Sequence, residues 1–161
     1  MGGGMARALL ESDATSEVTG FDMNRATLEQ FYKDSMAARK APPRMPLSQQ
    51  DSISTKTDFV VLALVNEKQC DMVCFGEGSI DNPPIIDLLP PKSCVILTST
   101  VTASWARKAQ ALFLAKSIHF VDCPMSGGPA RARQGKLTMM ASGDDASLAK
   151  AKPLIDCCLC K

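Results

Sequence analysis

The chain has 161 residues, a length that suits one domain with a single hydrophobic core. Hydrophobic residues make up 45% and charged residues 22%, which is typical of a globular chain and excludes a disordered one. With 18 basic and 17 acidic side chains the net charge is +1, and no stretch approaches the roughly 20 apolar residues of a membrane helix. We therefore expect no nucleic-acid partner and no membrane association.

The sequence does not open on a basic region followed by a long apolar run, so we expect no secretory signal and a cytoplasmic location. The seven cysteines are an odd number, and in such a protein they predict reduced thiols, mostly buried. Three of them gather in CCLCK (157–161), but no second ligand pair follows at the spacing of a zinc site. We therefore predict no metal site and treat a small metal protein as the weakest alternative.

The N-terminal part of the chain predicts two helices and one strand. Glycines at 2–4 lead into an apolar pattern that indicates a helix to about Glu11. The segment EVTGFD (17–22) predicts a short strand that ends in an acid, and Asn24 is a suitable N-cap for the helix that follows. The apolar face of that helix is expected to contain Leu28, Phe31, Tyr32 and Met36.

The next part begins with a loop and continues with a buried strand and a helix. Three prolines break the segment 41–57, for which we predict a loop and one short helix after Ser48. The apolar, β-branched run DFVVLALV (58–65) is typical of a strand buried on both faces of a parallel sheet. A helix is then predicted over 67–75, and Gly76 and Gly78 are expected to end it.

The second half of the chain repeats this alternation. SCVILTST (93–100) predicts a second buried strand, and 103–116 a helix. SIHFVD (117–122) predicts a third strand, followed by a glycine-rich loop over 123–136 and a fourth strand, LTMMAS (137–142). The residues expected to point inward from the helix are Trp105, Ala109, Leu112 and Phe113.

A last helix is predicted after Asp144 or Asp145, either of which is a good N-cap. Strands and helices then alternate through almost the whole chain, which predicts an α/β fold with a doubly wound, mostly parallel sheet of the Rossmann type. No repeat or linker marks a second domain, so we assign residues 1–161 to one domain.

The glycines at the start and the acid at position 22 have the order of a dinucleotide site. Glycines let the backbone approach a pyrophosphate at a helix N-terminus, and an acid about 20 residues further on accepts hydrogen bonds from the adenosine ribose. Asp22 lies 20 residues after Gly2 and ends a predicted strand. Spacing alone is a weak signal, but together with the order of elements it favours a dinucleotide site over ordinary turn chemistry.

Two further segments follow predicted strands and carry polar groups. In TSTVTAS (98–104), the hydroxyls can meet a ligand at the sheet edge, although capping of the next helix by Thr100 or Ser104 is the simpler interpretation. In the second, Ser126 and its two following glycines suit a carboxylate or another oxyanion, with Arg131 and Arg133 as added charge. A solvated loop explains this second segment equally well.

The segment DCPMSGGPARARQGKLTMMASGDDASLAKAKPLID (122–156) closely resembles the DAPVSGG…A…G.L…M.GG signature of the β-hydroxyacid dehydrogenases, which include 3-hydroxyisobutyrate dehydrogenase. MGGGMARALL resembles the end of the family's GLGxMGxxMAxxL turn, LVNEKQCDMVCFGEG its LPxxxxVxxVxxGxxG segment, and TSTVTAS its SSTxxP segment. The resemblance therefore runs end to end. Within the family, the chain is most similar to the L-threonate dehydrogenase branch, because it has VN in place of LP and carries the FGEG run.

The resemblance implies hydride transfer between nicotinamide and a small 3-hydroxy or sugar acid. It assigns NAD as cofactor, because the Asp22 carboxylate would repel the 2′-phosphate of NADP, although Arg25 leaves NADP open. It also assigns site residues by position. The implied cofactor-binding residues are Met1 and Gly2 at the pyrophosphate, Asp22 at the ribose with Asn24 and Arg25 beside it, Leu64, Val65 and Asn66 near the cofactor's middle, and Thr100 at the nicotinamide ribose. The implied substrate-binding residues are Ser126, Gly127 and Gly128.

The family pattern extends beyond both ends of this chain. The family's first strand would precede Met1, and its catalytic lysine, in a GxxGxxxKxxNN-like segment, and its helical domain would follow Lys161. We therefore expect a domain truncated at both ends, assign no catalytic residue, and expect marginal stability and little turnover. The rival hypothesis is a non-catalytic nucleotide-binding or interaction module that pairs its exposed sheet region with another chain, for example in a homo-oligomer.

Overall fold

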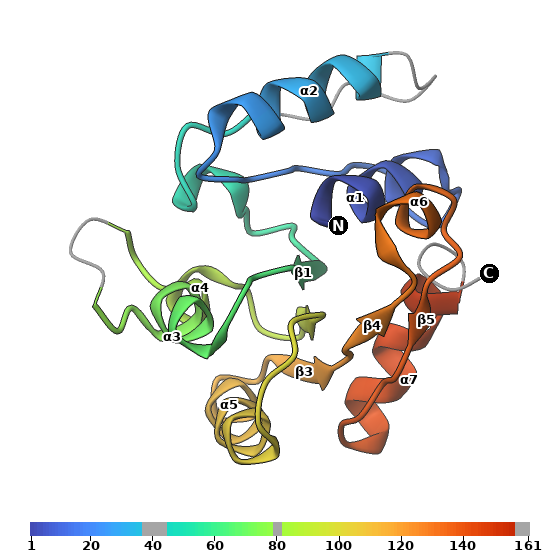
Figure 1. Ribbon diagram of the computed structural model, residues 1–161. Helices are drawn as coiled ribbons and strands as arrows, with labels where there is room; N and C mark the ends of the chain where they lie inside the picture. The colour runs from blue at the N-terminus through green and yellow to red at the C-terminus, as the bar shows by residue number, and fades with distance from the viewer. Residues whose placement is uncertain (37–44, 79–81, 157–161) are drawn as a thin grey trace. The chain divides into compact units, whose positions relative to one another are not determined.

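The computed structural model describes residues 1–36, 45–78 and 82–156. They form two compact units (Figure 1). Unit 1 comprises Met1–Ser52, Ser126–Met139 and Pro153–Lys161, and unit 2 comprises Ile53–Met125 and Met140–Lys152. No helix within the described residues is long and apolar enough to cross a membrane.

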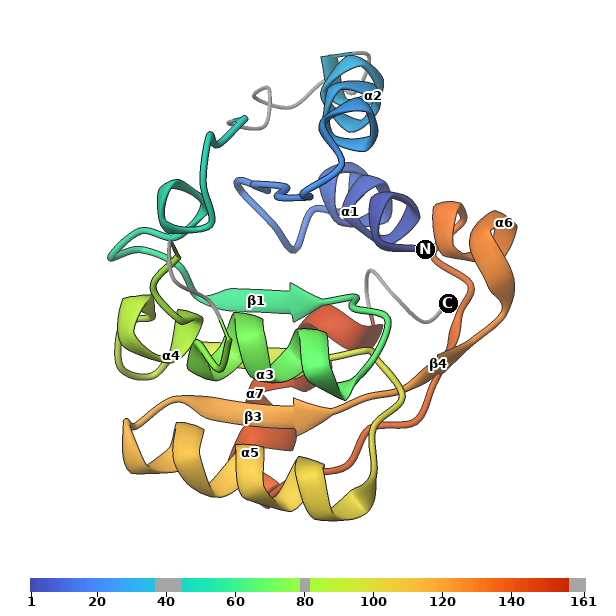
Figure 2. The same cartoon turned by 60° about the vertical axis from the view of Figure 1, so that its left-hand side comes forward.

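Unit 2 is built on a parallel sheet of three strands in the order β1-β2-β3. The strands are β1 (Phe59–Leu62), β2 (Cys94–Leu97) and β3 (His119–Asp122). They pair in register, with Phe59 opposite Cys94 and Cys94 opposite His119. Because all three run in the same direction, their carboxyl ends share one edge of the sheet (Figure 2).

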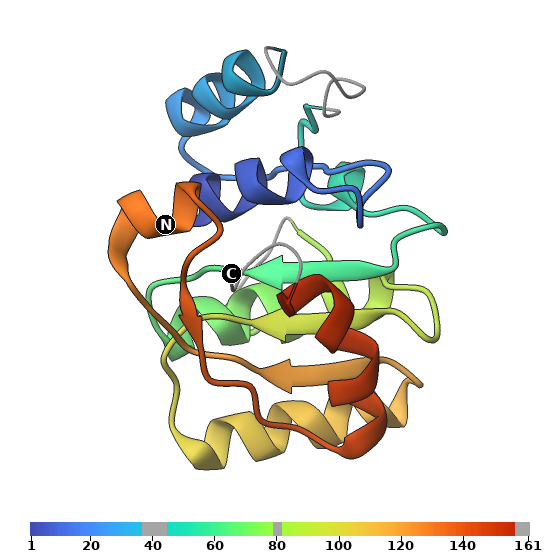
Figure 3. The ribbon, with the colours of Figure 1, turned by 90° about the vertical axis from the view of Figure 1, so that its right-hand side faces the viewer.

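Helices cover both faces of this sheet. Figures 2 and 3 show α3 (Glu67–Phe75) and α5 (Ala103–Ala115) on one face and α7 (Asp145–Leu154) on the other. The short helix α4 (Ile85–Leu88) packs beside α3. A parallel sheet between two helical layers is the predicted α/β, doubly wound arrangement, and it confirms the predicted fold class.

The core of unit 2 lies between the sheet and α3 and α5. All four residues of β2 are fully buried, and Phe113 stacks on Phe120 with ring centroids 5.5 Å apart. The prediction of a strand buried on both faces holds for β2, but in β1 only Leu62 is buried. The reason is position: β1 is an edge strand of this sheet, and β2 is central.

The four cysteines within the described residues are buried, as predicted, and Cys70, Cys74 and Cys94 are free thiols. Burial raises the pKa of Cys94 to about 12, and it also raises the pKa values of Cys70 and Cys74 above the usual thiol range. These thiols therefore stay protonated and serve as small apolar core groups rather than as nucleophiles. The CCLCK segment lies outside the described residues.

Unit 1 is mainly helical. It contains α1 (Gly2–Glu11), α2 (Arg25–Met36), the 3₁₀ helix Gln50–Ser52 and α6 (Gly128–Arg133). The two-residue strands β4 (Met125–Ser126) and β5 (Thr138–Met139) form a separate sheet, and β4 begins at the last residue of a unit 2 segment. Helix α1 packs on both α2 and α6.

The close contact between α1 and α6 depends on a glycine. A Cβ atom added at Gly4 would lie 3.0 Å from the Cβ of Ala132 and 3.1 Å from the backbone nitrogen of Arg133. A side chain at this position would require Ala132 or the Arg133 backbone to shift, so the glycine favours this close approach of the two helices. Buried side chains of α1, Met5, Ala8, Leu9 and Leu10, complete the core on this side.

Several predictions of local structure were wrong. The segment 17–22 is extended coil and not a strand, because no strand within the described residues lies beside it to exchange hydrogen bonds. The glycine-rich segment 123–136 contains α6, because Gly127 and Gly128 start a helical turn with Pro129 in it. The predicted fourth strand is reduced to β5 in the separate two-stranded sheet, followed by one antiparallel bridge between Ser142 and Asp122.

Two side chains predicted to point inward are exposed. Met36 is 61% exposed at the end of α2, where Ser35 is buried instead. Leu112 is 39% exposed, whereas Trp105, Ala109 and Phe113 form the buried face of α5 as predicted. In both helices the apolar residues in the sequence predict a wider buried face than the structure has.

Candidate functional site

The carboxyl ends of β1 and β2 in unit 2 carry the first part of the candidate site. In open parallel α/β sheets, ligands bind beyond these ends, where the loops leave the sheet. Here the loops are 63–66 after β1 and 98–102 after β2. They hold the predicted residues Leu64, Val65, Asn66 and Thr100.

Side-chain hydrogen bonds hold these two loops against each other. The Ser99 hydroxyl accepts from the Leu64 N–H at 2.8 Å, and the Thr98 hydroxyl donates to the Leu62 carbonyl oxygen at 2.8 Å. The Thr102 N–H donates to the Glu67 carboxylate and so links the starts of α3 and α5. The hydroxyl run is visible in the sequence, but the role of Ser99 is not, because pairing between distant loops leaves no local pattern.

Thr100 is free to meet a ligand. Helix α5 is capped by Thr102, whose hydroxyl accepts from the Trp105 N–H at 3.3 Å. The simpler interpretation of the sequence, capping by Thr100 or Ser104, was therefore wrong. Thr100 is exposed, and its hydroxyl makes no hydrogen bond within the described residues.

The loop after β1 combines a structural cap with an exposed apolar side chain. The Asn66 side-chain oxygen accepts from the Gln69 N–H at 3.0 Å and caps α3, while the Val65 N–H donates to the Gln69 side-chain oxygen at 3.0 Å. Val65 itself is 81% exposed at the sheet edge. A β-branched apolar side chain held there by its backbone provides a surface for the flat face of a ring.

The start of α1 in unit 1 fits an anion. Met1 is the N-cap residue but makes no side-chain cap hydrogen bond, and the first turn holds no acidic residue. The first backbone bonds run from the Gly4 and Met5 N–H groups to the Met1 carbonyl oxygen, so the helix itself offers no acceptor to the amides of Gly2 and Gly3. Uncapped amides at a helix N-terminus bind phosphate groups well.

The start of α2 is organised by Asp22 and Asn24. The Asp22 carboxylate accepts from the Asn24 N–H at 2.8 Å, and the Asn24 side chain accepts from the Ala26 N–H at 3.1 Å. Arg25 pairs with Glu29 on its own helix at 3.5 Å. The predicted N-cap role of Asn24 is confirmed, and it leaves Asp22 as an exposed carboxylate ahead of the helix.

The segment Ser126–Gly128 leads into α6. The φ angles of Gly127 and Gly128 are 137° and 74°, which L side chains rarely adopt. Ser126 is exposed. Arg131 donates from Nε to the Lys136 carbonyl oxygen at 2.7 Å, so its guanidinium closes the turn after α6. Of the two arginines considered as added charge, Arg133 makes no such bond within the described part of the chain.

The family model for the NAD binding domain of 6-phosphogluconate dehydrogenase matches residues 1–158. The chain belongs to this family.

Relatives agree with this assignment. The chain is 33% identical to an L-threonate dehydrogenase of Pectobacterium atrosepticum over 97% of its length and 47% of the relative's. It is 28% identical to an L-threonate dehydrogenase of Haemophilus influenzae over 95% of its length and 47% of the relative's. A crystal structure of 3-hydroxyisobutyrate dehydrogenase from Salmonella typhimurium superposes with a TM-score of 0.81 at 28% identity, covering 99% of this chain and 50% of that one. The chain thus spans about half the length of these relatives, and the resemblance predicted from the motifs is confirmed.

Within this NAD-binding family member, the predicted site residues fall into two groups. Met1, Gly2, the Asp22–Arg25 segment and Ser126–Gly128 lie in unit 1, where α1 and α6 are in direct contact. The segment 64–66 and Thr100 lie together at the carboxyl edge of the sheet in unit 2.

Proposed function

We propose that residues 1–161 act as one nucleotide-binding domain of an NAD-dependent dehydrogenase of the 3-hydroxyisobutyrate/L-threonate type. The observation that carries the proposal is the start of α1, where glycine amides without helical acceptors suit the pyrophosphate of a dinucleotide. The substrate would be a small 3-hydroxy or sugar acid. NADP is the second cofactor to test.

Each group of residues would bind a different part of the cofactor. Met1 and Gly2 would hold the pyrophosphate, because their end of α1 offers unpaired N–H groups. Asp22 would accept hydrogen bonds from the adenosine ribose, with Asn24 and Arg25 beside it. The Asp22 carboxylate disfavours a 2′-phosphate at the same place, since two like charges 4 Å apart repel by about 1 kcal/mol even in water.

At the sheet edge, Leu64, Val65 and Asn66 would contact the middle of the cofactor, and the Thr100 hydroxyl would bind the nicotinamide ribose. Ser126, Gly127 and Gly128 would hold the carboxylate and hydroxyl region of the substrate, because two glycines expose backbone N–H groups beside a free hydroxyl. NAD held by these residues would supply the hydride acceptor for the carbon that carries the substrate hydroxyl. We assign no residue of this chain to the removal of the hydroxyl proton.

Two finer points belong to this proposal. Cys70, Cys74 and Cys94 are free thiols, which supports a cytoplasmic location. The outer edge of β1 pairs with no strand within the described residues, which supports a homo-oligomer formed through this edge. Light scattering after gel filtration measures the oligomeric state, and a monomer at all concentrations would contradict the second point.

Calorimetric titration of the purified chain with NAD and with NADP tests the proposal. We expect weak saturable binding of NAD that is roughly fivefold tighter than that of NADP, the factor that about 1 kcal/mol provides. In Asp22→Asn, which keeps an oxygen to accept from the Asn24 N–H but loses the charge, the preference for NAD should disappear. The control Glu17→Gln removes an exposed acid from the same unit and should leave it unchanged.

No binding of either dinucleotide at millimolar concentration would overturn the proposal and favour an interaction module. Turnover is tested separately, by the absorbance of reduced cofactor after addition of NAD and an L-threonate or 3-hydroxyisobutyrate substrate. We expect little or none from this chain alone, since no catalytic base is assigned in it.

A further inference from the structure

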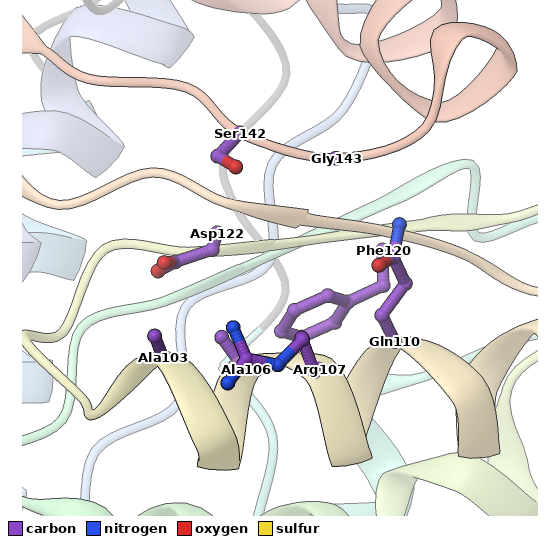
Figure 4. Close-up of a pocket in the computed structure, with 8 residues that line it drawn as sticks. All are labelled: Ala103, Ala106, Arg107, Gln110, Phe120, Asp122, Ser142 and Gly143. Carbon is purple, nitrogen blue, oxygen red and sulfur yellow. The ribbon is translucent and has the colours of Figure 1, made fainter.

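Unit 2 contains a small cavity that is not lined by any of the proposed cofactor-binding or substrate-binding residues. It lies between α5, the end of β3 and the segment 142–143, and its volume is about 120 Å³ (Figure 4). The residues that line it are Ala103, Ala106, Arg107, Gln110, Phe120, Asp122, Ser142 and Gly143.

Asp122 lines this cavity, and one of its carboxylate oxygens lacks a hydrogen-bond donor within the described residues. Asp122 ends β3, and its backbone is fully engaged with Ser142: the Asp122 N–H donates at 2.9 Å, and its carbonyl oxygen accepts at 2.7 Å. These two bonds fix the position of the residue. Its Oδ1 atom is nonetheless buried without a partner within the described residues. Buried acceptors without a donor are rare in folded proteins, so this atom points to a missing donor group.

A cationic group lies beside this carboxylate. Arg107 is exposed on α5 and forms no ion pair or hydrogen bond within the described residues. Figure 4 shows its guanidinium on the side of α5 that faces Asp122. Gln110, one turn further along, is oriented by its hydrogen bond to the Asp144 carboxylate at 3.3 Å. The remaining wall is apolar, formed by Phe120, Ala103 and Ala106.

These groups select the kind of ligand. A metal ion is disfavoured, because a single carboxylate faces a guanidinium. An inorganic anion would satisfy Arg107 but leave the Asp122 oxygen unpaired and add repulsion. A molecule that carries a carboxylate and, one or two carbons away, a hydrogen-bond donor satisfies both groups at once. The cavity volume is several times the roughly 10–15 Å³ that one water molecule requires, so it accommodates several non-hydrogen atoms.

We propose that this cavity is a second small-molecule site, which binds a short carboxylic acid with a hydroxyl or ammonium group through Arg107 and Asp122. The ligand carboxylate pairs with the Arg107 guanidinium, and the ligand donor hydrogen-bonds to the Asp122 carboxylate. Burial raises the pKa of the Asp122 carboxyl, so its charge is more easily lost than that of an exposed aspartate, which favours a neutral hydroxyl as the donor.

Titration of the full chain, followed by ¹H–¹⁵N NMR spectra, tests this site with three probes: glycolate, glycine and acetate. We expect saturable shifts at residues 103–110 and 142–143 with glycolate, and binding of acetate up to about tenfold weaker because it lacks the donor. Glycine decides whether an ammonium replaces the hydroxyl. Equal affinity for all three, or no saturable shift with any of them, would overturn the proposal.

Variants separate this site from the proposed substrate loop. Arg107→Met removes the cation from an exposed position and should weaken glycolate binding about tenfold or more. Asp122→Ala should weaken it as well, with the melting temperature as a check on folding. Lys108→Met removes the neighbouring exposed cation, which pairs with Glu77 at 3.4 Å, and should change nothing. Loss of binding in Ser126→Ala but not in Arg107→Met would place the ligand at the substrate loop instead.

Discussion

Unit 2 and unit 1 position their candidate site residues in different ways. In unit 2 a parallel ladder with a buried central strand holds the loops, and the hydroxyl of Ser99 ties one loop to the other. In unit 1 the candidate residues lie at helix starts and in a glycine turn, and the extended segment 17–22 pairs with no strand among the residues that the structure describes. The difference teaches that sheet-edge positions are set by many backbone bonds, whereas the unit 1 positions depend on a few side-chain caps and one close helix contact.

The largest expected effect is on the core of unit 2. Phe113→Ala should lower the free energy of unfolding by about 3–5 kcal/mol, because Phe113 is fully buried and stacks on Phe120. Urea unfolding followed by the fluorescence of Trp105, the single tryptophan, measures this. The neighbouring Leu112→Ala is the control, since Leu112 is 39% exposed. A loss as large in the control would show that the buried face of α5 is assigned wrongly.

The helix contact in unit 1 gives the next effect. Gly4→Val should cost about 1–3 kcal/mol of unfolding free energy, because a side chain there collides with Ala132 and the Arg133 backbone. Circular dichroism during urea unfolding measures it. Gly3→Ala is the matched control: nothing lies within 4 Å of its added Cβ, so it should stabilise α1 by roughly 0.5–1 kcal/mol. Equal destabilisation by both variants would contradict the α1–α6 contact.

A smaller effect is expected at the cap of α3. Asn66→Ala should lower stability by about 1 kcal/mol, because the Gln69 N–H loses its acceptor at 3.0 Å. Thermal unfolding measures the change. Asn66→Asp keeps an acceptor oxygen at the same place and should retain most of the stability. If both variants melt at the same reduced temperature, the loss comes from another property of the asparagine.

The smallest effect is a change in pH dependence. Burial raises the pKa of Asp122, so above the ordinary aspartate pKa of about 3.9 the folded chain keeps this proton longer than the unfolded chain. Stability therefore falls as the pH rises through the raised pKa. Asp122→Asn cannot ionise and should lack this fall, which melting temperatures across pH 4 to 7 reveal.

Asp144 also contributes to the pH dependence of stability. The melting temperatures of the unchanged chain and of Asp122→Asn must therefore be compared at each pH. Hydrogen bonds from Ser147 lower the pKa of Asp144, so this group stabilises the fold above the ordinary aspartate pKa and loses that contribution as the pH falls through its lowered value. Asp144 is present in both proteins and cancels in the difference. A difference in melting temperature that stays constant with pH would contradict the raised pKa of Asp122.

Most features that depend on neighbouring residues were predictable from the sequence. The start of α1 at its glycines, the cap of α2 at Asn24 and the end of α3 at Gly76 all follow from local backbone chemistry. Gly76 adopts a φ of 76°, the left-handed conformation that ends helices. Family membership was also predictable, because the glycine, hydroxyl and SGG segments are short motifs with characteristic spacing.

The errors arose where distant parts of the chain decide the outcome. The segment 17–22 has strand composition, but a strand exists only when another strand pairs with it. Thr102 rather than Thr100 caps α5, because the Glu67 carboxylate, 35 residues away, holds the Thr102 N–H. The unpaired Asp122 oxygen was equally invisible, since the sequence does not show which donors surround a buried atom.

The sequence by itself therefore determined the parallel strands β1, β2 and β3, the helices α3 and α5 between them, the cap of α2 at Asn24, the glycine that ends α3, and the family to which the chain belongs. The tertiary structure alone decided which strand is central and fully buried, which hydroxyl is left free at the sheet edge, and where a charged side chain lacks a partner. The physical reason is range: caps and turns are satisfied within a few residues, whereas burial and the pairing of polar groups depend on segments that meet only in the folded chain.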